Sequence, residues 1–102
     1  MKEDLLSIIK HYGVLPQLKY FQSEVFELNE AVITRELHWN CDTEFQDIKP
    51  FDEHIAEEIA DCCVMLGQFK NYYGITDEEL EEICLFKIKR QLERIESEAK
   101  KE

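Results

Sequence analysis

Two pairs of acidic residues in this sequence have a spacing that can bring carboxylates together. Glu24 and Glu27 form the first pair and Glu58 and Asp61 the second, with a step of three residues in each. Residues three apart are neighbours on the surface of a helix. Crowded carboxylates repel one another unless a cation neutralises them, and Mg²⁺ prefers carboxylate oxygens. The spacing therefore predicts a divalent-metal site, in which Mn²⁺ can substitute for Mg²⁺.

The position of each pair relative to the apolar residues supports this prediction. Each residue advances a helix by about 100°, so Glu58 is expected at the edge of an apolar stripe, with Asp61 on the same flank. Glu24 and Glu27 have the same relation to a second stripe, formed by Leu18, Phe21, Val25, Leu28 and Val32. If the two helices pack as antiparallel neighbours, all four carboxylates converge. The alternative, a solvated acidic face in a chain with 23 acidic residues, explains one pair better than two matched ones.

A group of cations near the C-terminus complements the acids. Lys87, Arg90 and Arg94 are expected on one flank of the last helix, where they can bind phosphates. In the alternative interpretation, Arg90 pairs with Glu93 and Arg94 with Glu98 along the same helix. Lys87 has no acid at a comparable spacing.

The elements that hold these residues are expected to be helices only. Three glycines and two prolines interrupt the chain, and no run of β-branched residues has a period of two. We expect helices at about residues 3–12, 15–38, 50–73 and 76–99. Gly13 and Gly74 mark two of the ends, and Thr76 begins a capping box with Glu79.

The bulk properties limit the classes of function. With 102 residues the chain is expected to form one domain, and 44% hydrophobic with 34% charged residues is typical of a folded soluble protein. A net charge of −11 opposes binding to nucleic acid polymers or anionic membranes. The N-terminal stretch lacks the apolar core of a signal peptide, so we expect a cytoplasmic protein with reduced, packed cysteines. These are Cys41, Cys62, Cys63 and Cys84.

These motifs together resemble those of a known family. The segment SEVFELNEA at residues 23–31, followed by EIAD at 58–61, resembles the ExxE…ExxD motif of the MazG-like, all-α nucleoside triphosphate pyrophosphohydrolases. The basic segment at 87–95 is similar to the last helix of that family, and the resemblance covers about residues 15–96. One departure is that many members carry an asparagine close after the lysine of this helix, where this chain has Arg90 and Gln91.

The resemblance implies a four-helix bundle that assembles as a homodimer or homotetramer. It implies that Glu24, Glu27, Glu58 and Asp61 bind Mg²⁺ and carry the catalysis, and that Lys87, Arg94 and Arg90 contact phosphates. The implied reaction is hydrolysis of a ribo- or deoxyribonucleoside triphosphate to the monophosphate and pyrophosphate. Phosphoryl transfer fits the acids independently, because it depends on charge neutralisation and positioning. Glu27, expected farther from the apolar stripe, is the better candidate to deprotonate water.

Other functions remain open at this level. A non-catalytic helical module for oligomerisation or nucleotide-binding regulation would keep the same fold, and an acidic mimic of nucleic acid would explain the charge but not the matched pairs. Tyr12, Tyr20 and Trp39 are candidates to stack on a base, although aromatic residues in small helical proteins more often pack in cores. A second apolar strip, formed by Phe26, Ile33 and Leu37, predicts an oligomer interface.

Overall fold

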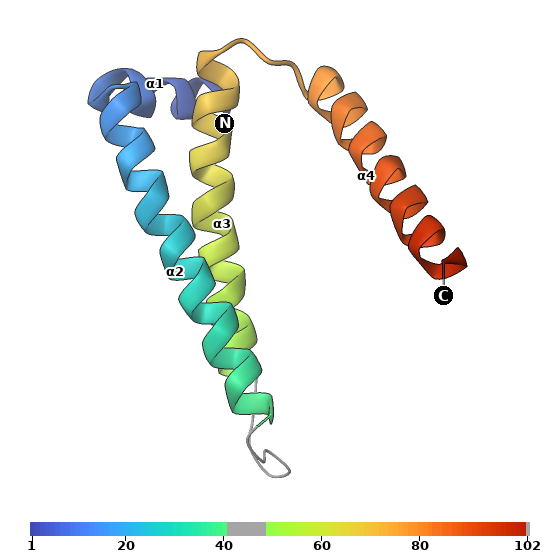
Figure 1. Ribbon diagram of the computed structural model, residues 1–102. Helices are drawn as coiled ribbons and strands as arrows, with labels where there is room; N and C mark the ends of the chain where they lie inside the picture. Colours follow the sequence, from blue (N-terminus) through green and yellow to red (C-terminus); the bar gives the residue numbers. More distant parts are fainter. Residues whose placement is uncertain (41–48, 102) are drawn as a thin grey trace. The chain divides into compact units, whose positions relative to one another are not determined.

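The computed structural model describes residues 1–40 and 49–101, and these residues form four helices and no strand (Figure 1). They are α1 (Lys2–Tyr12), α2 (Val14–Asn40), α3 (Lys49–Tyr72) and α4 (Asp77–Lys100). The all-helical prediction is confirmed, and the predicted helix ends agree closely with the observed ones. Within the same residues, no helix is apolar over a stretch long enough to cross a bilayer.

The chain divides into two compact units, Met1–Tyr72 and Tyr73–Glu102. The first unit contains α1, α2 and α3. The second contains α4, in which no residue is buried among those that the structure describes. The predicted all-α class is thus established, whereas the arrangement of all four helices as one bundle stays a prediction.

Local sequence explains where the helices begin and end. Gly13 separates α1 from α2 with a φ of 95°, in the left-handed region that a residue with a side chain rarely adopts. At the start of α4, Thr76 Oγ1 accepts a hydrogen bond from the Glu79 backbone N–H at 3.1 Å. Glu79 Oε2 in turn accepts one from the Thr76 backbone N–H at 3.3 Å. The capping box predicted from the sequence is therefore present.

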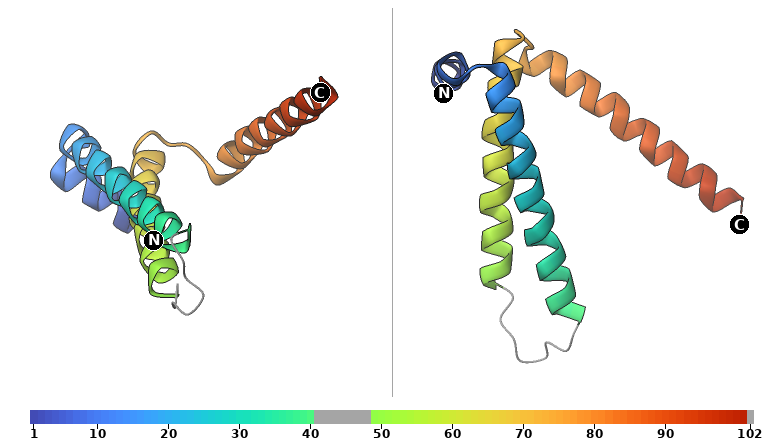
Figure 2. Two further views of the ribbon diagram at one scale, coloured as in Figure 1. Left: turned by 60° about the horizontal axis from the view of Figure 1, so that its bottom comes forward. Right: turned by 60° about the vertical axis from the view of Figure 1, so that its left-hand side comes forward.

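The first unit is built on α2 and α3, which run side by side in opposite directions (Figures 1 and 2). The aromatic rings of Phe21 and Phe69 meet edge to face, with centroids 5.9 Å apart. Nearer the other end of the pair, Arg35 Nε donates a hydrogen bond to Asp52 Oδ1 at 2.9 Å. These contacts join the two helices on either side of the segment that carries the acids.

Helix α1 packs against α3 through a close approach at a glycine. A Cβ atom added to Gly67 would lie 2.8 Å from Leu5 Cδ1, which is shorter than ordinary van der Waals contact. The absence of a side chain at Gly67 therefore lets α1 lie directly on α3. Ile9, one turn further along α1, is completely buried.

The interior of this unit is unusually polar for its size. Among the residues whose burial the structure describes, four apolar ones are buried, and so are four polar or charged ones: Gln17, Glu24, Glu58 and Gln68. Burial of an acid or an amide is unfavourable unless a partner satisfies it. A core of this composition is better suited to binding a ligand than to maximal stability.

The position of the acids on their helices differs from the sequence prediction. Glu24 and Glu58 do not lie at the edge of the buried faces but in their middle. On α2 the buried residues are Gln17, Glu24 and Ala31, which recur every seven residues and so return to one face. Val25, assigned to the apolar stripe, is exposed, as is Leu66 on α3. The prediction was wrong because it located the core from apolar residues alone.

Candidate metal centre

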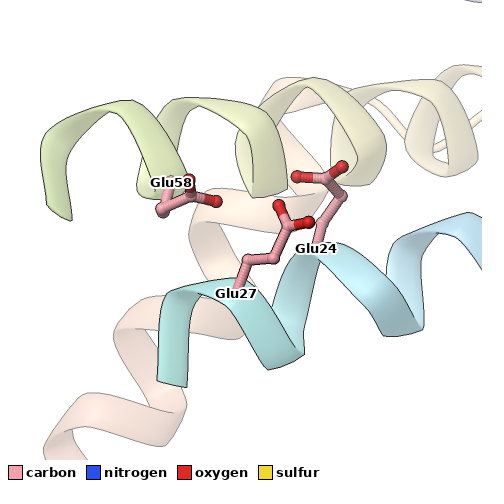
Figure 3. A group of neighbouring side chains, drawn as sticks. All are labelled: Glu24, Glu27 and Glu58. Atoms are coloured by element: carbon pink, nitrogen blue, oxygen red, sulfur yellow. The ribbon is translucent and has the colours of Figure 1, made fainter. Parts of the chain in front are cut away.

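Three of the four predicted acids form a cluster between α2 and α3. Glu24 and Glu27 extend from α2 and Glu58 from α3, with their carboxylates turned toward one another (Figure 3). One carboxylate oxygen of each residue lies within 4.8 Å of one from each of the other two. The antiparallel packing of the helices thus converts two separate motifs into one group of oxygen ligands.

The buried members of the cluster lack partners for part of their hydrogen-bonding capacity. Glu24 Oε2 and Glu58 Oε2 are both buried, and neither has a hydrogen-bond partner. Glu24 is only 5% exposed, and Glu58 is 8% exposed. Two unpartnered buried oxygens on facing carboxylates are unfavourable without a cation. The donor set, carboxylate oxygen throughout, suits Mg²⁺ or another hard divalent ion.

Glu58 has a second neighbour on its own helix. Its Oε1 lies 3.8 Å from His54 Nε2, one turn earlier on α3. The other ring nitrogen, Nδ1, lies 3.9 Å from Glu57 Oε2 on the exposed side. His54 therefore stands beside the cluster, next to one carboxylate oxygen of Glu58. The spacing of four residues between His54 and Glu58 is visible in the sequence, and it is the signal that points to this contact.

The electrostatics of the cluster centre on Glu24. Burial raises the pKa of the Glu24 carboxyl, and the negative charges of Glu27 and Asp61 raise it further. A hydrogen bond with Tyr20, one turn earlier on α2, acts in the opposite direction. The same hydrogen bond raises the pKa of the Tyr20 hydroxyl above its ordinary value. A divalent cation would favour the ionised form of Glu24, because it supplies the missing positive charge.

Asp61, the fourth predicted ligand, is placed differently from the other three. It is exposed and lies outside the group of Glu24, Glu27 and Glu58. It is nevertheless close enough to Glu24 to raise the pKa of that carboxyl, and both residues line the same pocket. Asp61 therefore borders the cluster at the mouth of this pocket, and its role as a direct ligand stays a prediction.

The predicted phosphate-binding cations belong to the second unit. Lys87, Arg90 and Arg94 are all exposed on α4. Among the residues that the structure describes, Arg90 and Arg94 make no ion pair, although α4 contains one between Lys100 and Glu96. The alternative in which the two arginines pair with Glu93 and Glu98 therefore finds no support. Contact of these cations with a phosphate remains a prediction.

The cysteines follow the sequence prediction only in part. Cys62 is buried in the α2–α3 contact, and burial raises the pKa of its thiol. Cys63 is exposed, so the prediction that it is a packing residue is wrong, and Cys84 is exposed on α4 of the second unit. Cys63 follows Cys62 directly, and a step of one residue turns a side chain by about 100° away from the buried face. Cys41 and the side chain of Trp39 lie outside the described residues.

A pocket of about 520 Å³ adjoins the acids, and sequence reasoning missed it. Its wall includes Tyr12 and Tyr20, which had been considered for base stacking, together with Gln17 and Gln68. The two glutamines had not been singled out, because an isolated glutamine in a helix carries no motif. Their spacing was the available signal: Gln17 precedes Glu24 by seven residues, and Gln68 follows Asp61 by seven.

No known protein family, curated protein or solved structure matches this chain. The functional assignment consequently depends on the residues and geometry of the site itself.

Proposed function

We propose that this protein is a Mg²⁺-dependent hydrolase that cleaves a nucleoside triphosphate to the monophosphate and pyrophosphate. The observation that carries the proposal is that Glu24 on α2 and Glu58 on α3, whose carboxylates are turned toward each other (Figure 3), each bury one oxygen without a hydrogen-bond partner. The adjoining pocket supports it, because a nucleotide needs room beside its phosphates. The ExxE and ExxD spacing supports the same class of reaction.

The burial of each acid indicates its role in the proposed reaction. Glu24 and Glu58, which are buried, would hold the cation together with Glu27, and Asp61 would be a further ligand from the wall of the pocket. Mg²⁺, when bound, neutralises phosphate charge and helps to align the reacting groups. Glu27 is exposed and can reach a water molecule from the solvent side of the cluster.

The proposed reaction is a hydrolysis of the anhydride between the α- and β-phosphates. The oxygen of water forms a bond to phosphorus while the bridging phosphorus–oxygen bond breaks, and the bridging electron pair stays with the departing group. Glu27 accepts the proton of the attacking water. Lys87 and Arg94, with Arg90 beside them, would stabilise the negative charge on the phosphates.

Assembly of several copies is part of the proposal. The strip of Phe26, Ile33 and Leu37 on α2 is exposed, and all three residues are more than half exposed, at 63%, 54% and 61%. Apolar surface of this extent is typical of an interface, and we propose that a homodimer or homotetramer covers it.

A direct assay tests the proposed activity. The protein is incubated with Mg²⁺ and a panel of standard and modified ribo- and deoxyribonucleoside triphosphates, and monophosphate and pyrophosphate are measured. We expect turnover of at least one substrate, loss of turnover in Glu58→Gln, and retention in Glu57→Gln, a matched change on the exposed side of α3. Binding of a nucleotide without turnover would instead indicate a non-catalytic regulatory module.

A further inference from the structure

The pocket beside the acid cluster contains a pair of buried amides next to several apolar side chains. Ile8 and Tyr12 of α1 and Val64 and Met65 of α3 form much of its wall. Gln17 Nε2 donates a hydrogen bond to Gln68 Oε1 at 2.8 Å, which links α2 to α3. Every residue of this pocket belongs to the first unit.

The amide pair is held in one orientation. Gln68 is only 2% exposed, and its Nε2 donates to Met65 Sδ at 3.5 Å. Since Nε2 of Gln68 is directed at the sulfur, its Oε1 is left to accept from Gln17. An amide has two N–H donors and a carbonyl acceptor, so the bond to Gln68 accounts for one donor of Gln17. Thioether sulfur is a weak acceptor, and replacing both glutamines by an apolar pair of similar size is expected to cost little stability. The glutamines therefore fit recognition better than packing.

The register of α2 and α3 aligns the amides with the acids. Gln17 precedes Glu24 by seven residues, and Gln68 follows Asp61 by seven, so the amide pair and the acids share one face of the helix pair. Seven residues correspond to two helical turns, or about 10 Å along the helix axis. In a nucleotide the ribose likewise places the base at a distance from the phosphates. A ligand with its base among the amides would thus direct its phosphates toward Glu24 and Asp61.

We propose that this pocket binds the nucleobase of the substrate, and that Gln17 and Gln68 read the hydrogen-bonding edge of the base. This inference rests on the proposed function. Tyr20, more than half exposed on the wall of the pocket, would lie against the face of the base. An amide offers both a donor and an acceptor, which matches the mixed donor and acceptor edges of the bases. Bases that cannot match the fixed amide pair would be rejected.

The test uses nucleosides, which have a base but no phosphate, so that neither metal nor turnover is needed. The full-length ¹⁵N-labelled protein in EDTA is titrated with adenosine, guanosine, cytidine, uridine and thymidine, and the side-chain amide resonances are followed by NMR. The resonances of Gln17 and Gln68 are assigned by their loss in Gln17→Met and Gln68→Met. We expect saturable shifts of these resonances with some nucleosides and not others, and no shift with ribose 5-phosphate.

Two variants and one control separate recognition from folding. Gln17→Met keeps the side-chain length and should weaken nucleoside binding about 10-fold or more. Tyr20→Leu changes an exposed wall residue, which folding tolerates, and should weaken binding by roughly 10-fold through lost stacking. Gln22→Leu, an exposed glutamine on the same helix, should leave binding unchanged.

The outcomes distinguish this inference from the proposed function. If triphosphates are hydrolysed but no nucleoside shifts the Gln17 or Gln68 resonances, the base pocket is wrong and the hydrolase proposal stands. If nucleosides bind but no triphosphate is cleaved, the pocket stands and the hydrolase proposal fails. Shifts of the same resonances with protein concentration alone would place a second copy of the chain in the pocket and overturn the inference.

Discussion

Glu24 on α2 and Glu58 on α3 face each other across the helix contact, and each buries one carboxylate oxygen without a hydrogen-bond partner. If the cluster binds a cation, as we propose, its occupancy is measurable through the stability of the fold.

Mg²⁺ should stabilise the folded protein through this pair. Binding to the folded state alone adds about 2.7 kcal/mol to the free energy of unfolding at a concentration 100 times the Kd. We expect a clear rise in Tm with MgCl₂, absent in Glu58→Gln and preserved in Glu57→Gln, as measured by differential scanning calorimetry. An equal rise in Glu58→Gln would show that the ion binds elsewhere.

The metal-free protein should lose stability as the pH rises through the titration of Glu24. Burial raises the pKa of this carboxyl in the folded state, so the folded state binds its proton more tightly than the unfolded state. The resulting stabilisation is fully present below the pKa of the unfolded chain and is lost as the pH rises through the higher folded pKa. Glu24→Gln removes this dependence.

Urea denaturation in EDTA between about pH 4 and pH 8 measures the effect. At neutral pH we expect Glu24→Gln to be more stable than the natural sequence by on the order of 1–3 kcal/mol, the penalty of an unsatisfied buried group. The difference should shrink toward pH 4 and reverse sign in saturating Mg²⁺. A constant difference at every pH would exclude Glu24 as the titrating group.

The sequence predicted the helices well because the signals for them are local. Gly13 and the Thr76 capping box act within one turn, and the observed structure confirms both. The proximity of Glu24 and Glu58 was predictable too. When two antiparallel helices with matched acid spacings pack against each other, few relative positions of the acidic side chains remain.

What the sequence did not reveal depends on contacts between distant residues. Gln17 and Gln68 are 51 positions apart, and only the packed helices bring them to one hydrogen bond. The centre of the buried face of α2 was also predicted wrongly from the apolar residues, because Gln17, Glu24 and Ala31 occupy that centre. A site that buries polar residues breaks the hydrophobic pattern from which a core is inferred.

The packing of α1 should depend on the missing side chain at Gly67. Gly67→Ala would place Cβ 2.8 Å from Leu5 Cδ1, and such overpacking costs about 1–3 kcal/mol. The gain in helix propensity, about 1 kcal/mol, offsets part of that cost. In a Leu5→Ala background the clash is gone, so the same substitution should stabilise the protein. Denaturation of the four proteins of this double-mutant cycle measures the coupling, and strict additivity would contradict the contact.

Assembly should depend on the apolar strip of α2. Ile33→Glu introduces a charge into the strip of Phe26, Ile33 and Leu37, and we expect sedimentation equilibrium to show a shift from oligomer to monomer. Thr34→Glu, at the exposed neighbouring position, is the matched control and should leave the mass unchanged. If both variants keep the mass of the natural protein, the interface lies on another surface.

The cations of α4 should contribute to substrate binding and not to the metal centre. A charge-assisted hydrogen bond to phosphate contributes about 1.5–3 kcal/mol, so Arg94→Ala or Lys87→Ala should lower kcat/KM by roughly 10-fold to 100-fold. The stabilisation by Mg²⁺ alone should stay as large as in the natural protein, because these residues lie on α4 and the acids on α2 and α3. Lys89→Ala is the matched control. Lys89 lies about 140° around the same helix from Arg94, so its substitution should leave kcat/KM unchanged. Equal losses in Lys89→Ala and Arg94→Ala would indicate a general effect of net charge, and the phosphate contact would then be excluded.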